Sequence, residues 1–349
     1  MKKKAAVIGY GGMGSWHVNH IQNSDVVELA GIYDILPEKR ELAESRGIHA
    51  YASREELLAD KSIELVTIAI PNDVHEEVGI ACMEAGKNVI MEKPVTLSLE
   101  SLERLIACSE KNGVRFTVHQ NRRFDVDFLA MKQLHDSGEI GEIINIESRV
   151  HGSRGIPSDW RGQKIHGGGM LYDWGIHLID QILNILGWDV KTVRCRFDHI
   201  TNDEVDDGFG MDLTFASGAR AYVELGTYNF IAMPRFYMRG MKGTAYLSDW
   251  QKETQVVKCK HWHESDVIPV QTAAGLTKTM APRDSVTVDT YTVPRPVSDV
   301  HDFYRNFVGA IDGKCEQLVT HEQMRILLRI IMLGFKSAEN GAVELPYEA

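Results

Sequence analysis

A six-residue glycine loop near the start of the chain limits the possible folds more than any other feature. The sequence GYGGMG at 9–14 follows an apolar run at 4–9 and opens a helical pattern at 15–21. In such a strand–loop–helix unit the first glycine permits a tight turn, the second lets the backbone approach a pyrophosphate, and the third lets helix and strand pack closely. The exposed amides at the helix start would bind the phosphates. The predicted phosphate contacts are Gly9, Gly11, Gly12, Met13 and Gly14.

The end of the next apolar run narrows the ligand to a dinucleotide. That run covers 26–34 and ends in Asp34, 20 residues after Gly14. A carboxylate at this position accepts hydrogen bonds from the ribose hydroxyls of NAD and would repel the 2′-phosphate of NADP. We therefore expect NAD as the cofactor and NADP as the less favoured alternative, although Lys39 and Arg40 weaken that preference. A plain glycine turn before an acidic strand end is disfavoured, because strand, loop, helix and acid occur in register.

The first third of the chain alternates short apolar runs with helical patterns. Further strands are predicted at 63–70, 88–91 and 114–119, and helices at 37–46, 72–84 and 98–111. Strands that alternate with helices of this size form parallel βαβ units, and an almost continuously apolar strand suits a sheet covered on both faces. We predict an α/β Rossmann domain with a parallel sheet over residues 1–122.

The hydrophobic period changes after about residue 140. Apolar and polar residues alternate over 209–215 and 220–225 on either side of a Ser-Gly turn, which predicts an antiparallel hairpin. Other strands are expected at 143–150, 235–247 and 254–261, and helices at 168–186, 298–311 and 320–339. Residues 123–349 therefore form a predicted α+β domain with an antiparallel sheet and helices on one side. The length of 349 residues favours two domains, and the lack of a Pro-, Gly- or Ser-rich linker suggests that they meet closely at a cleft.

The overall charge disfavours two classes of partner. The chain has 38 basic and 49 acidic residues, a formal charge of −11, which argues against nucleic acid and anionic membrane surfaces. The lysines at 2–4 run into an apolar strand and are interpreted as a solvated chain start, without the features of a signal peptide. No apolar stretch is long enough for a membrane span. The five scattered cysteines, without a CxxC pattern, indicate reduced thiols, so we expect a cytoplasmic protein.

A charged pair follows the predicted strand at 88–91. Glu92 and Lys93 stand there before Pro94, and ligands of open parallel sheets bind at the carboxyl ends of strands. The Lys93 ammonium would therefore lie near a nicotinamide ring, where it could bind a reacting oxygen and stabilise its developing charge. A surface lysine after a strand is the alternative.

A second group of candidate residues lies in the sequence GGGMLYDWGIH at 167–177. Asp173 and His177 are four residues apart, so they share one face of the predicted helix, away from its apolar stripe. The ordinary titration range of imidazole suits His177 to accept a hydroxyl proton, and Asp173 could orient a substrate or tune His177. A surface pair that supports the helix is the alternative.

Together these motifs resemble the Gfo/Idh/MocA oxidoreductases, the family of glucose–fructose oxidoreductase and inositol dehydrogenase. The matching segments are the glycine loop at 9–14, Glu-Lys-Pro at 92–94, Asn-Arg-Arg-Phe at 121–124 and Asp-x-Gly-x-His at 173–177, in the family's order over nearly the whole chain. The resemblance implies a second domain with an open, mainly antiparallel sheet, which commonly forms the subunit interface, and hence a homodimer or homotetramer. The catalytic set that it implies is Lys93, Asp173 and His177.

The resemblance also points to residues around these motifs. It implies a cis peptide between Lys93 and Pro94. Cofactor contacts beyond the glycine loop and Asp34 are expected from Pro71, Asn72, His75, Glu92 and Lys93. Substrate contacts are expected from His119, Arg122, Trp160, Arg161 and His166. For most of these residues a packing or surface role is the open alternative.

The activity implied by the resemblance is hydride transfer between NAD(H) and a ring carbinol carbon of a sugar, inositol or glycoside. In that reaction His177 would act as general base and Lys93 would polarise the oxygen. Two alternatives stay open: an NAD-retaining enzyme that cleaves glycosides by transient oxidation and elimination, and a non-catalytic NAD(H) sensor. Cys259, His261 and His263 alternate along a predicted strand and could hold zinc, but no fourth ligand is evident, so no metal site is expected.

Overall fold

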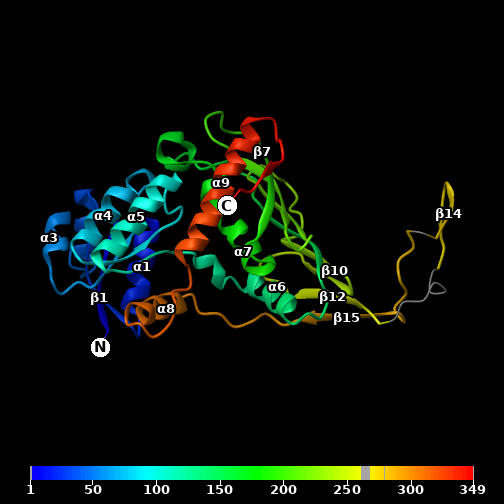
Figure 1. Ribbon diagram of the computed structural model, residues 1–349, viewed down its shortest axis with the longest axis horizontal. Coiled ribbons are helices and arrows are strands. Elements are labelled where there is room, and N and C mark those ends of the chain that lie inside the picture. Colours follow the sequence, from blue (N-terminus) through cyan, green and yellow to red (C-terminus); the bar gives the residue numbers. More distant parts are fainter. Residues whose placement is uncertain (1, 261–267, 279, 349) are drawn as a thin grey trace.

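The computed structural model describes residues 2–260, 268–278 and 280–348. Two bodies lie side by side, one built around a five-stranded sheet and the other around a nine-stranded sheet (Figure 1). A narrow arm, of which residues 268–278 and 280–287 are described, projects from the far end of the second body. The predicted fold class is confirmed, and the predicted division at 122–123 remains a prediction.

The first sheet is fully parallel. Its strands are β1 (Lys3–Ile8), β2 (Val27–Tyr33), β3 (Leu65–Ile68), β4 (Asn88–Met91) and β5 (Phe116–Val118), in the order β2-β1-β3-β4-β5. Its helices are α1 (Gly12–Gln22), α2 (Pro37–Ser45), α3 (Arg54–Ala59), α4 (His75–Glu84) and α5 (Leu99–Asn112). Every residue of β3 is buried, as expected for a central parallel strand covered on both faces. The strand order reverses between β1 and β3, where sheets of this kind bind ligands at the carboxyl ends of their strands.

Two glycines of the loop after β1 are required by their surroundings. Gly9 has a φ of +93°, and a Cβ there would lie 2.2 Å from the carbonyl oxygen of Ala69. A Cβ on Gly14 would lie 1.9 Å from the carbonyl oxygen of Gly9. At Gly11 and Gly12 a Cβ would meet no described atom within 4 Å, so this side of the loop is open. The tight turn and the close helix–strand packing predicted for the first and third glycines are therefore present.

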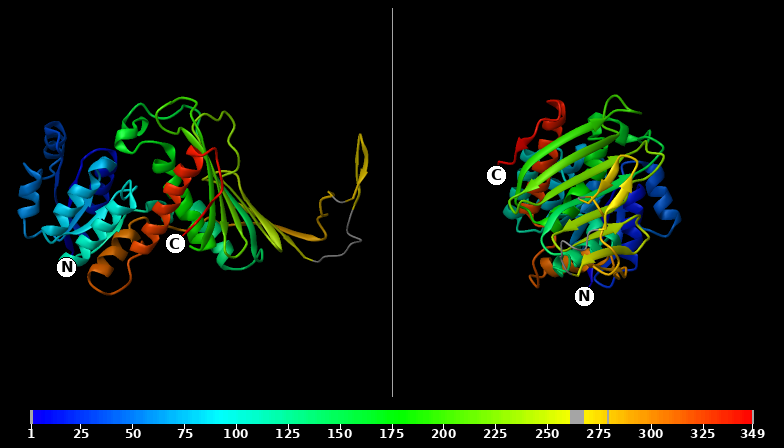
Figure 2. Two further views of the ribbon diagram at one scale, coloured as in Figure 1. Left: turned by 45° about the horizontal axis from the view of Figure 1, so that its top comes forward. Right: turned by 90° about the vertical axis from the view of Figure 1, so that its right-hand side faces the viewer.

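The second sheet is open and mainly antiparallel, as expected. Its strands are β6 (Ile143–His151), β7 (Val190–Asp198), β8 (Gly208–Phe215), β9 (Arg220–Gly226), β10 (Phe236–Gly240), β11 (Gly243–Leu247), β12 (Thr254–Cys259), β15 (Val288–Val293) and β16 (Leu345–Pro346). They follow the order β15-β12-β11-β10-β6-β9-β8-β7-β16, with β6 and β9 parallel. The helices α6 (Val126–Asp136), α7 (Ile176–Leu186) and α9 (His321–Glu339) pack on one face. The other face carries no helix among the residues drawn in Figure 2.

Two predicted elements differ from the structure in detail. The single strand predicted at 235–247 is instead the hairpin β10–β11. The chain turns after Gly240, and only glycine fits at this position, because a Cβ there would lie 2.3 Å from the carbonyl oxygen of Ile140. The helix predicted at 168–186 begins with a π-helical turn, Leu171–Gly175, and continues as α7.

The end of the chain joins the two bodies. Helix α8 (Asp302–Ile311) inserts Phe303, Tyr304 and Phe307 into the core of the first body. Helix α9 contributes to both cores, with Leu328 in the first and Ile330 in the second. Its start is stabilised by a capping box between Thr320 and Gln323.

A buried ion pair ties the loop after β5 to α7. The Arg123 guanidinium donates two hydrogen bonds to Asp180, at 2.8 and 2.6 Å, and a third to the carbonyl oxygen of Leu318 at 2.7 Å. The two charged side chains are only 5% and 2% exposed. Removing one partner of such a pair leaves the other charge buried without compensation.

Replacing Asp180 with Asn should therefore lower the free energy of unfolding by about 3–5 kcal/mol. The matched control is Asp136→Asn, which removes an exposed ion pair with Lys132 on α6 and should cost less than about 1 kcal/mol. Urea unfolding of the full chain, followed by circular dichroism, measures both values. Equal losses in the two variants would contradict the assigned role of Asp180.

Candidate active site

Lys93 and Asp173, from different bodies, meet in a partly buried ion pair. Lys93 Nζ donates hydrogen bonds to Asp173 Oδ1 and to the Asp173 carbonyl oxygen, both at 2.7 Å. Arg161 Nε donates to the other carboxylate oxygen at 3.1 Å. Burial opposes ionisation of Asp173, but the charges of Lys93 and Arg161 outweigh it and hold the pKa of that carboxyl below its usual value. Asp173 is therefore an anion between two cations.

Both partners are placed by local backbone constraints. Lys93 follows the carboxyl end of β4, and its peptide bond to Pro94 is cis, as the resemblance implied. Asp173 lies in the π-helical turn before α7. The glycine run before this turn is required sterically, since a Cβ on Gly168 would lie 2.3 Å from the Arg161 carbonyl oxygen. The glycines thus let the loop that carries Arg161 pack against the start of the helix.

Asp206 supports the start of the same helix and was not identified from the sequence. Its Oδ2 accepts a hydrogen bond from the Leu171 amide at 2.8 Å, and its backbone carbonyl accepts one from the Met170 amide at 3.0 Å. Burial raises the pKa of Asp206 to about 8. A Cβ on Gly169 would lie 2.2 Å from Asp206 Oδ1, so the predicted glycine-rich entry accommodates this carboxyl group.

His177 is a buried, neutral imidazole one turn after Asp173. The residue is 5% exposed, and its Nδ1 has no hydrogen-bond partner among the described residues. Burial, and then the positive charges of Lys93 and Arg122, hold the pKa of His177 well below its ordinary value. A neutral imidazole can accept a proton, which is the property required of a general base.

Glu92, which precedes Lys93 in the chain, lies in a buried hydrogen-bond network. His119 Nδ1 and His17 Nε2 approach the same oxygen, Glu92 Oε1, at 2.7 and 2.8 Å. The other ring nitrogen of His17 lies 2.7 Å from the Tyr304 hydroxyl on α8. Burial opposes ionisation of Glu92, but His119 and His17 keep its pKa well below the usual value, while burial lowers the pKa of His17 to about 4. Because a carboxylate only accepts, both imidazoles donate to it, and Tyr304 donates to His17.

Two imidazoles and a carboxylate of this network are also the kinds of side chain that bind metal ions. The ligand atoms of His17, Glu92 and His119 lie within 4.8 Å of one another. The hydrogen bonds to the carboxylate already account for this short separation. Of the zinc ligands considered from the sequence, Cys259 ends β12, and His261 and His263 lie outside the described residues.

The loop after β3 holds its neighbours in place. Asn72 donates to the carbonyl oxygens of His166 and Gly167, at 3.3 and 3.2 Å. The ring nitrogens of His75 each lie 3.0 Å from a carbonyl oxygen, one on Ile70 and the other on Pro94. Asn72 and His75, predicted as cofactor contacts, therefore also fix the bend at Pro94 and the loop before Asp173.

Aromatic rings and arginines border His177. The Arg122 guanidinium lies 4.0 Å from the ring centre of Trp174 and 5.6 Å from that of Trp250, and Trp174 lies 6.3 Å from His177. Arg161 lies over Trp160 at 4.6 Å. Of the predicted substrate contacts, Arg161 therefore contacts Asp173 directly, Trp160 lies against Arg161, and Arg122 lies against Trp174. His119 is fully buried, and His166 pairs with Asp73 at 3.2 Å.

Asp34 lies against the glycine loop. Its Oδ2 accepts a hydrogen bond from the Tyr10 amide at 2.6 Å, and its Oδ1 accepts one from the Leu36 amide at 2.9 Å. The Arg40 side chain donates to the carbonyl oxygens of Asp34 and Ile35, at 2.6 and 3.2 Å. The carboxylate is therefore adjacent to the open side of the loop, and Arg40 is engaged by the backbone.

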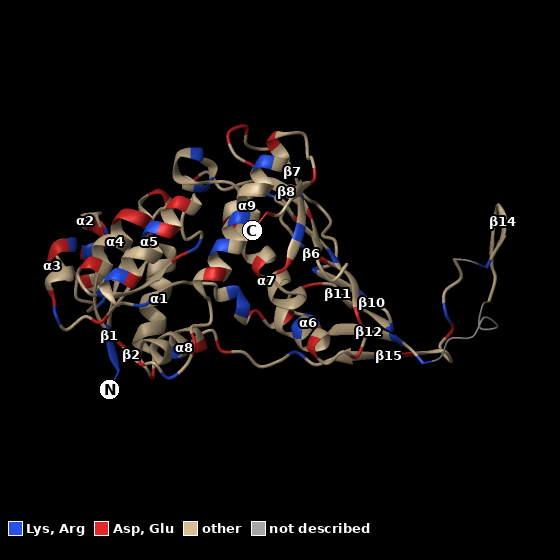
Figure 3. Ribbon diagram, viewed as in Figure 1, with Lys and Arg blue, Asp and Glu red and all other residues tan. Residues whose placement is uncertain are grey.

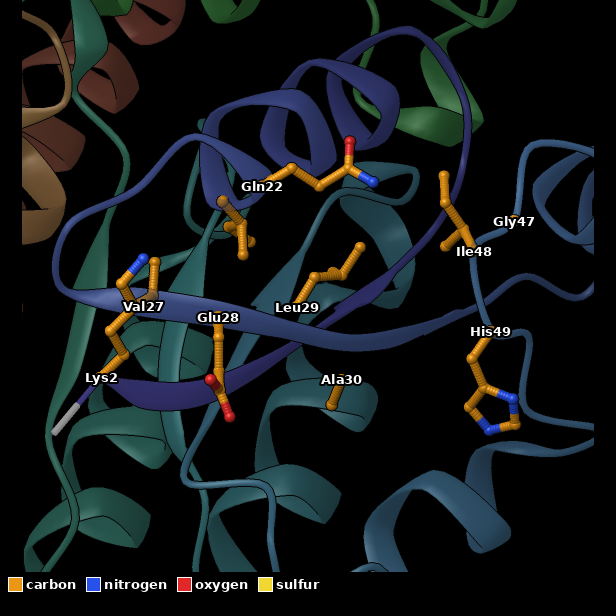
Figure 4. Close-up of a pocket in the computed structure, with 10 residues that line it drawn as sticks. Lys2, Gln22, Val27, Glu28, Leu29, Ala30, Gly47, Ile48 and His49 are labelled. Carbon is orange, nitrogen blue, oxygen red and sulfur yellow. The ribbon is translucent and has the colours of Figure 1, made fainter.

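A separate hollow lies at the outer edge of the first sheet. Its volume is about 370 Å³. Figure 4 shows the residues that line it, among them Gln22 of α1, residues 27–30 of β2 and residues 47–49. None of the candidate residues lines it, so the hollow is not part of the site.

Comparison with known proteins identifies the architecture. Residues 3–120 match the family model described as "Oxidoreductase family, NAD-binding Rossmann fold", and residues 128–246 match "GFO/IDH/MocA C-terminal domain". The structure of an NAD-binding protein from Listeria innocua is 42% identical, with 99% of this chain and 100% of that chain covered and a TM-score of 0.95. A scyllo-inositol 2-dehydrogenase (NADP(+)) from Bacillus subtilis is 29% identical over 96% of this chain and 94% of its own length. An inositol 2-dehydrogenase from Salmonella typhimurium is 32% identical over 56% of this chain and 58% of its own length.

These matches define an oxidoreductase with a Rossmann domain for a nicotinamide cofactor. The chain belongs to the Gfo/Idh/MocA family, as its motifs had indicated. In the part of the chain that the structure describes, no helix has the length and hydrophobicity needed to cross a membrane.

The low pKa of His177 gives a direct test of the site. Replacing Arg122 with Gln should raise the pKa of His177, because a positive charge that opposes protonation is removed. Arg122→Lys keeps the charge and should leave the pKa close to that of the wild type. Titration of the imidazole resonances by NMR, assigned with His177→Gln, measures both. Equal shifts in the two variants would show that packing, not charge, sets the pKa.

Proposed function

We propose that this protein is an NAD(H)-dependent dehydrogenase that interconverts a ring hydroxyl and a ring carbonyl of a sugar, inositol or glycoside. The observation that carries this proposal is the Lys93–Asp173 ion pair at the end of β4, beside the buried neutral imidazole of His177. Two relatives are named as inositol dehydrogenases, which supports a polyol substrate.

The side chains supply the groups needed to remove a hydroxyl proton. An ammonium group has three N–H donors, and Asp173 occupies two of those of Lys93, so the third can bind the substrate oxygen. His177 accepts the hydroxyl proton, and Asp173 holds Lys93 in place while it orients a neighbouring hydroxyl. Acid–base assistance of this kind is worth roughly 10²–10⁴-fold in rate.

The residues of the first body fit a dinucleotide. The pyrophosphate would lie on the open side of the loop at Gly11 and Gly12, at the start of α1, and Asp34 would accept hydrogen bonds from the adenosine ribose. When bound, the nicotinamide supplies the hydride acceptor. The negative charge of Asp34 and the engagement of Arg40 by backbone carbonyl oxygens favour NAD over NADP, although one relative is named for NADP.

Replacing His177 with Gln should lower kcat by about 10²–10⁴-fold, because the proton acceptor is lost. The dissociation constant of NADH should stay within about threefold of the wild type, since His177 is not assigned to its binding. The measurements are NADH formation at 340 nm with inositols, free sugars and glycosides, and a fluorescence titration of NADH. Comparable losses of turnover and NADH affinity would contradict the assignment.

The same assay separates the alternatives. Consumption of a glycoside without net NADH, by protein that retains NAD through purification, would indicate transient oxidation and elimination. NADH binding without turnover of any member of the substrate panel would favour a sensor.

The cofactor preference is tested at Asp34. Replacing it with Ser should weaken the preference for NAD over NADP, measured as a ratio of kcat/KM values, by at least about tenfold, because repulsion of the 2′-phosphate is removed. Asp136→Ser, on the second body, is the control and should leave the ratio unchanged. A wild-type preference for NADP would reject the NAD assignment.

A further inference from the structure

The chain carries an arm that has no core of its own. Strands β12 and β15 pair with each other at one edge of the large sheet, and the described residues between them, 268–278 and 280–287, lie away from both bodies (Figures 1 and 2). Near its tip, β13 (Val270–Thr272) and β14 (Gly275–Thr277) form a two-stranded sheet. Among the described residues, no third strand joins this hairpin. A two-stranded hairpin alone is only marginally stable in water.

The apolar side chains of the arm are exposed. Leu276 is 71% exposed, Met280 81%, Val286 71% and Ile268 59%. Single exposed apolar residues are ordinary, but a group of them on a projecting segment marks an interaction site. The arm therefore needs a surface that covers it.

A second group of exposed apolar residues lies in the loop between β9 and β10. Phe230 is 76% exposed, Ile231 87% and Met233 53%. The Asn229 amide of this loop donates to the Gly152 carbonyl oxygen at 2.7 Å. The loop thus rests on the segment that continues from the end of β6 to Arg161 and the candidate active site.

The arm and this loop lie at opposite ends of the sheet. The loop follows Gly226, which pairs with His151 at the end of β6. The arm follows β12, which ends beside the β10–β11 turn, because Lys258 pairs with Gly243. That turn lies at the start of β6, because Gly240 pairs with Ile143. The arm therefore points away from the loop of its own chain. Two copies related by a two-fold axis, with strands running in opposite directions, would bring each arm to the loop of the other.

The helix-free face between the two ends suits a second copy. Arg149 pairs there with Glu147 and Glu224 on β6 and β9, so this face carries paired charges of both signs and not charges of a single sign. Figure 3 shows basic and acidic residues interspersed across the second body. A stable dimer buries roughly 1,600 Å² in total, more than a hairpin tip supplies, so the arm would act together with this face.

We propose that the arm is a docking element for a second copy of this chain, and that its apolar residues cover the loop 227–234 of that copy. The contact is isologous: each chain donates one arm and accepts the other. An unrelated protein is disfavoured because this chain itself carries both halves of the contact. The proposal does not depend on the proposed activity.

The first test compares three variants of the full chain by sedimentation equilibrium. The arm variant is Leu276→Asp with Met280→Asp, the loop variant is Phe230→Asp with Ile231→Asp, and the control is Val297→Asp, at a residue that is 100% exposed. The arm and loop variants should each raise the dissociation constant of the dimer at least about 30-fold, because charges would be placed in an apolar contact. The control should match the wild type, and circular dichroism checks that all variants are folded. A monomeric wild type, or a dimer that either variant leaves unchanged, would overturn the proposal.

The second test identifies the contact. Two differently tagged chains, both with Cys315→Ser to remove an exposed thiol, are co-expressed, one carrying Leu276→Cys and the other Ile231→Cys. Mild oxidation should yield a disulfide-linked dimer that contains both tags, and chains with only one of the two cysteines should give none. A dimer that forms normally but shows no cross-link between the tags would reject the loop as the acceptor.

Discussion

The contact between Lys93 and Asp173 joins the carboxyl end of a strand in one body to the helix of the other. Its partners come from segments 80 residues apart, and the ammonium spans the interface with two 2.7 Å hydrogen bonds. Such a contact is sensitive to small displacements of either body. Helix α9 restricts these displacements, because it contributes side chains to both cores. Helix α8 packs into the first core, and the buried Arg123–Asp180 pair holds the loop after β5 against α7. The geometry of the site therefore depends on the interface, not on either sheet alone.

Neighbouring side chains of the site carry opposite charges or no charge. Glu92 is a carboxylate between two imidazoles, Lys93 and Arg161 are cations, Asp173 is an anion and His177 is neutral. In a medium of low effective dielectric constant each of these charges strongly affects its neighbours. Two ring nitrogens, His119 Nε2 and His177 Nδ1, have no partner within the described residues. Buried polar atoms without partners are uncommon, and each calls for an explanation; for His177 Nδ1 the proposed role as proton acceptor supplies one.

Short-range requirements made much of the fold predictable. The glycine loop at 9–14, the acidic end of β2 and the Lys-Pro bend at 93–94 are set by turns and strand ends, which local sequence describes well. Networks assembled from distant segments were not predicted. His17, Glu92, His119 and Tyr304 come from four elements, and Asp206 supports the helix start from 35 residues away. His17 stands one turn after Gly14 on the buried side of α1, and that position was the one signal in the sequence for this network.

The sequence by itself determined the class of fold, the family and the residue types of the candidate site, because these depend on periodicity, turn geometry and motif spacing. Only the tertiary structure decided which groups meet. It placed Arg161 on Asp173, stacked Arg122 on Trp174 and turned Glu92 and His119 into the core. It also left the arm at 268–278 and 280–287 without a core. The physical reason is that charge pairing, burial and exposure are properties of packed surfaces, and such surfaces arise from segments that the linear order of residues does not bring together.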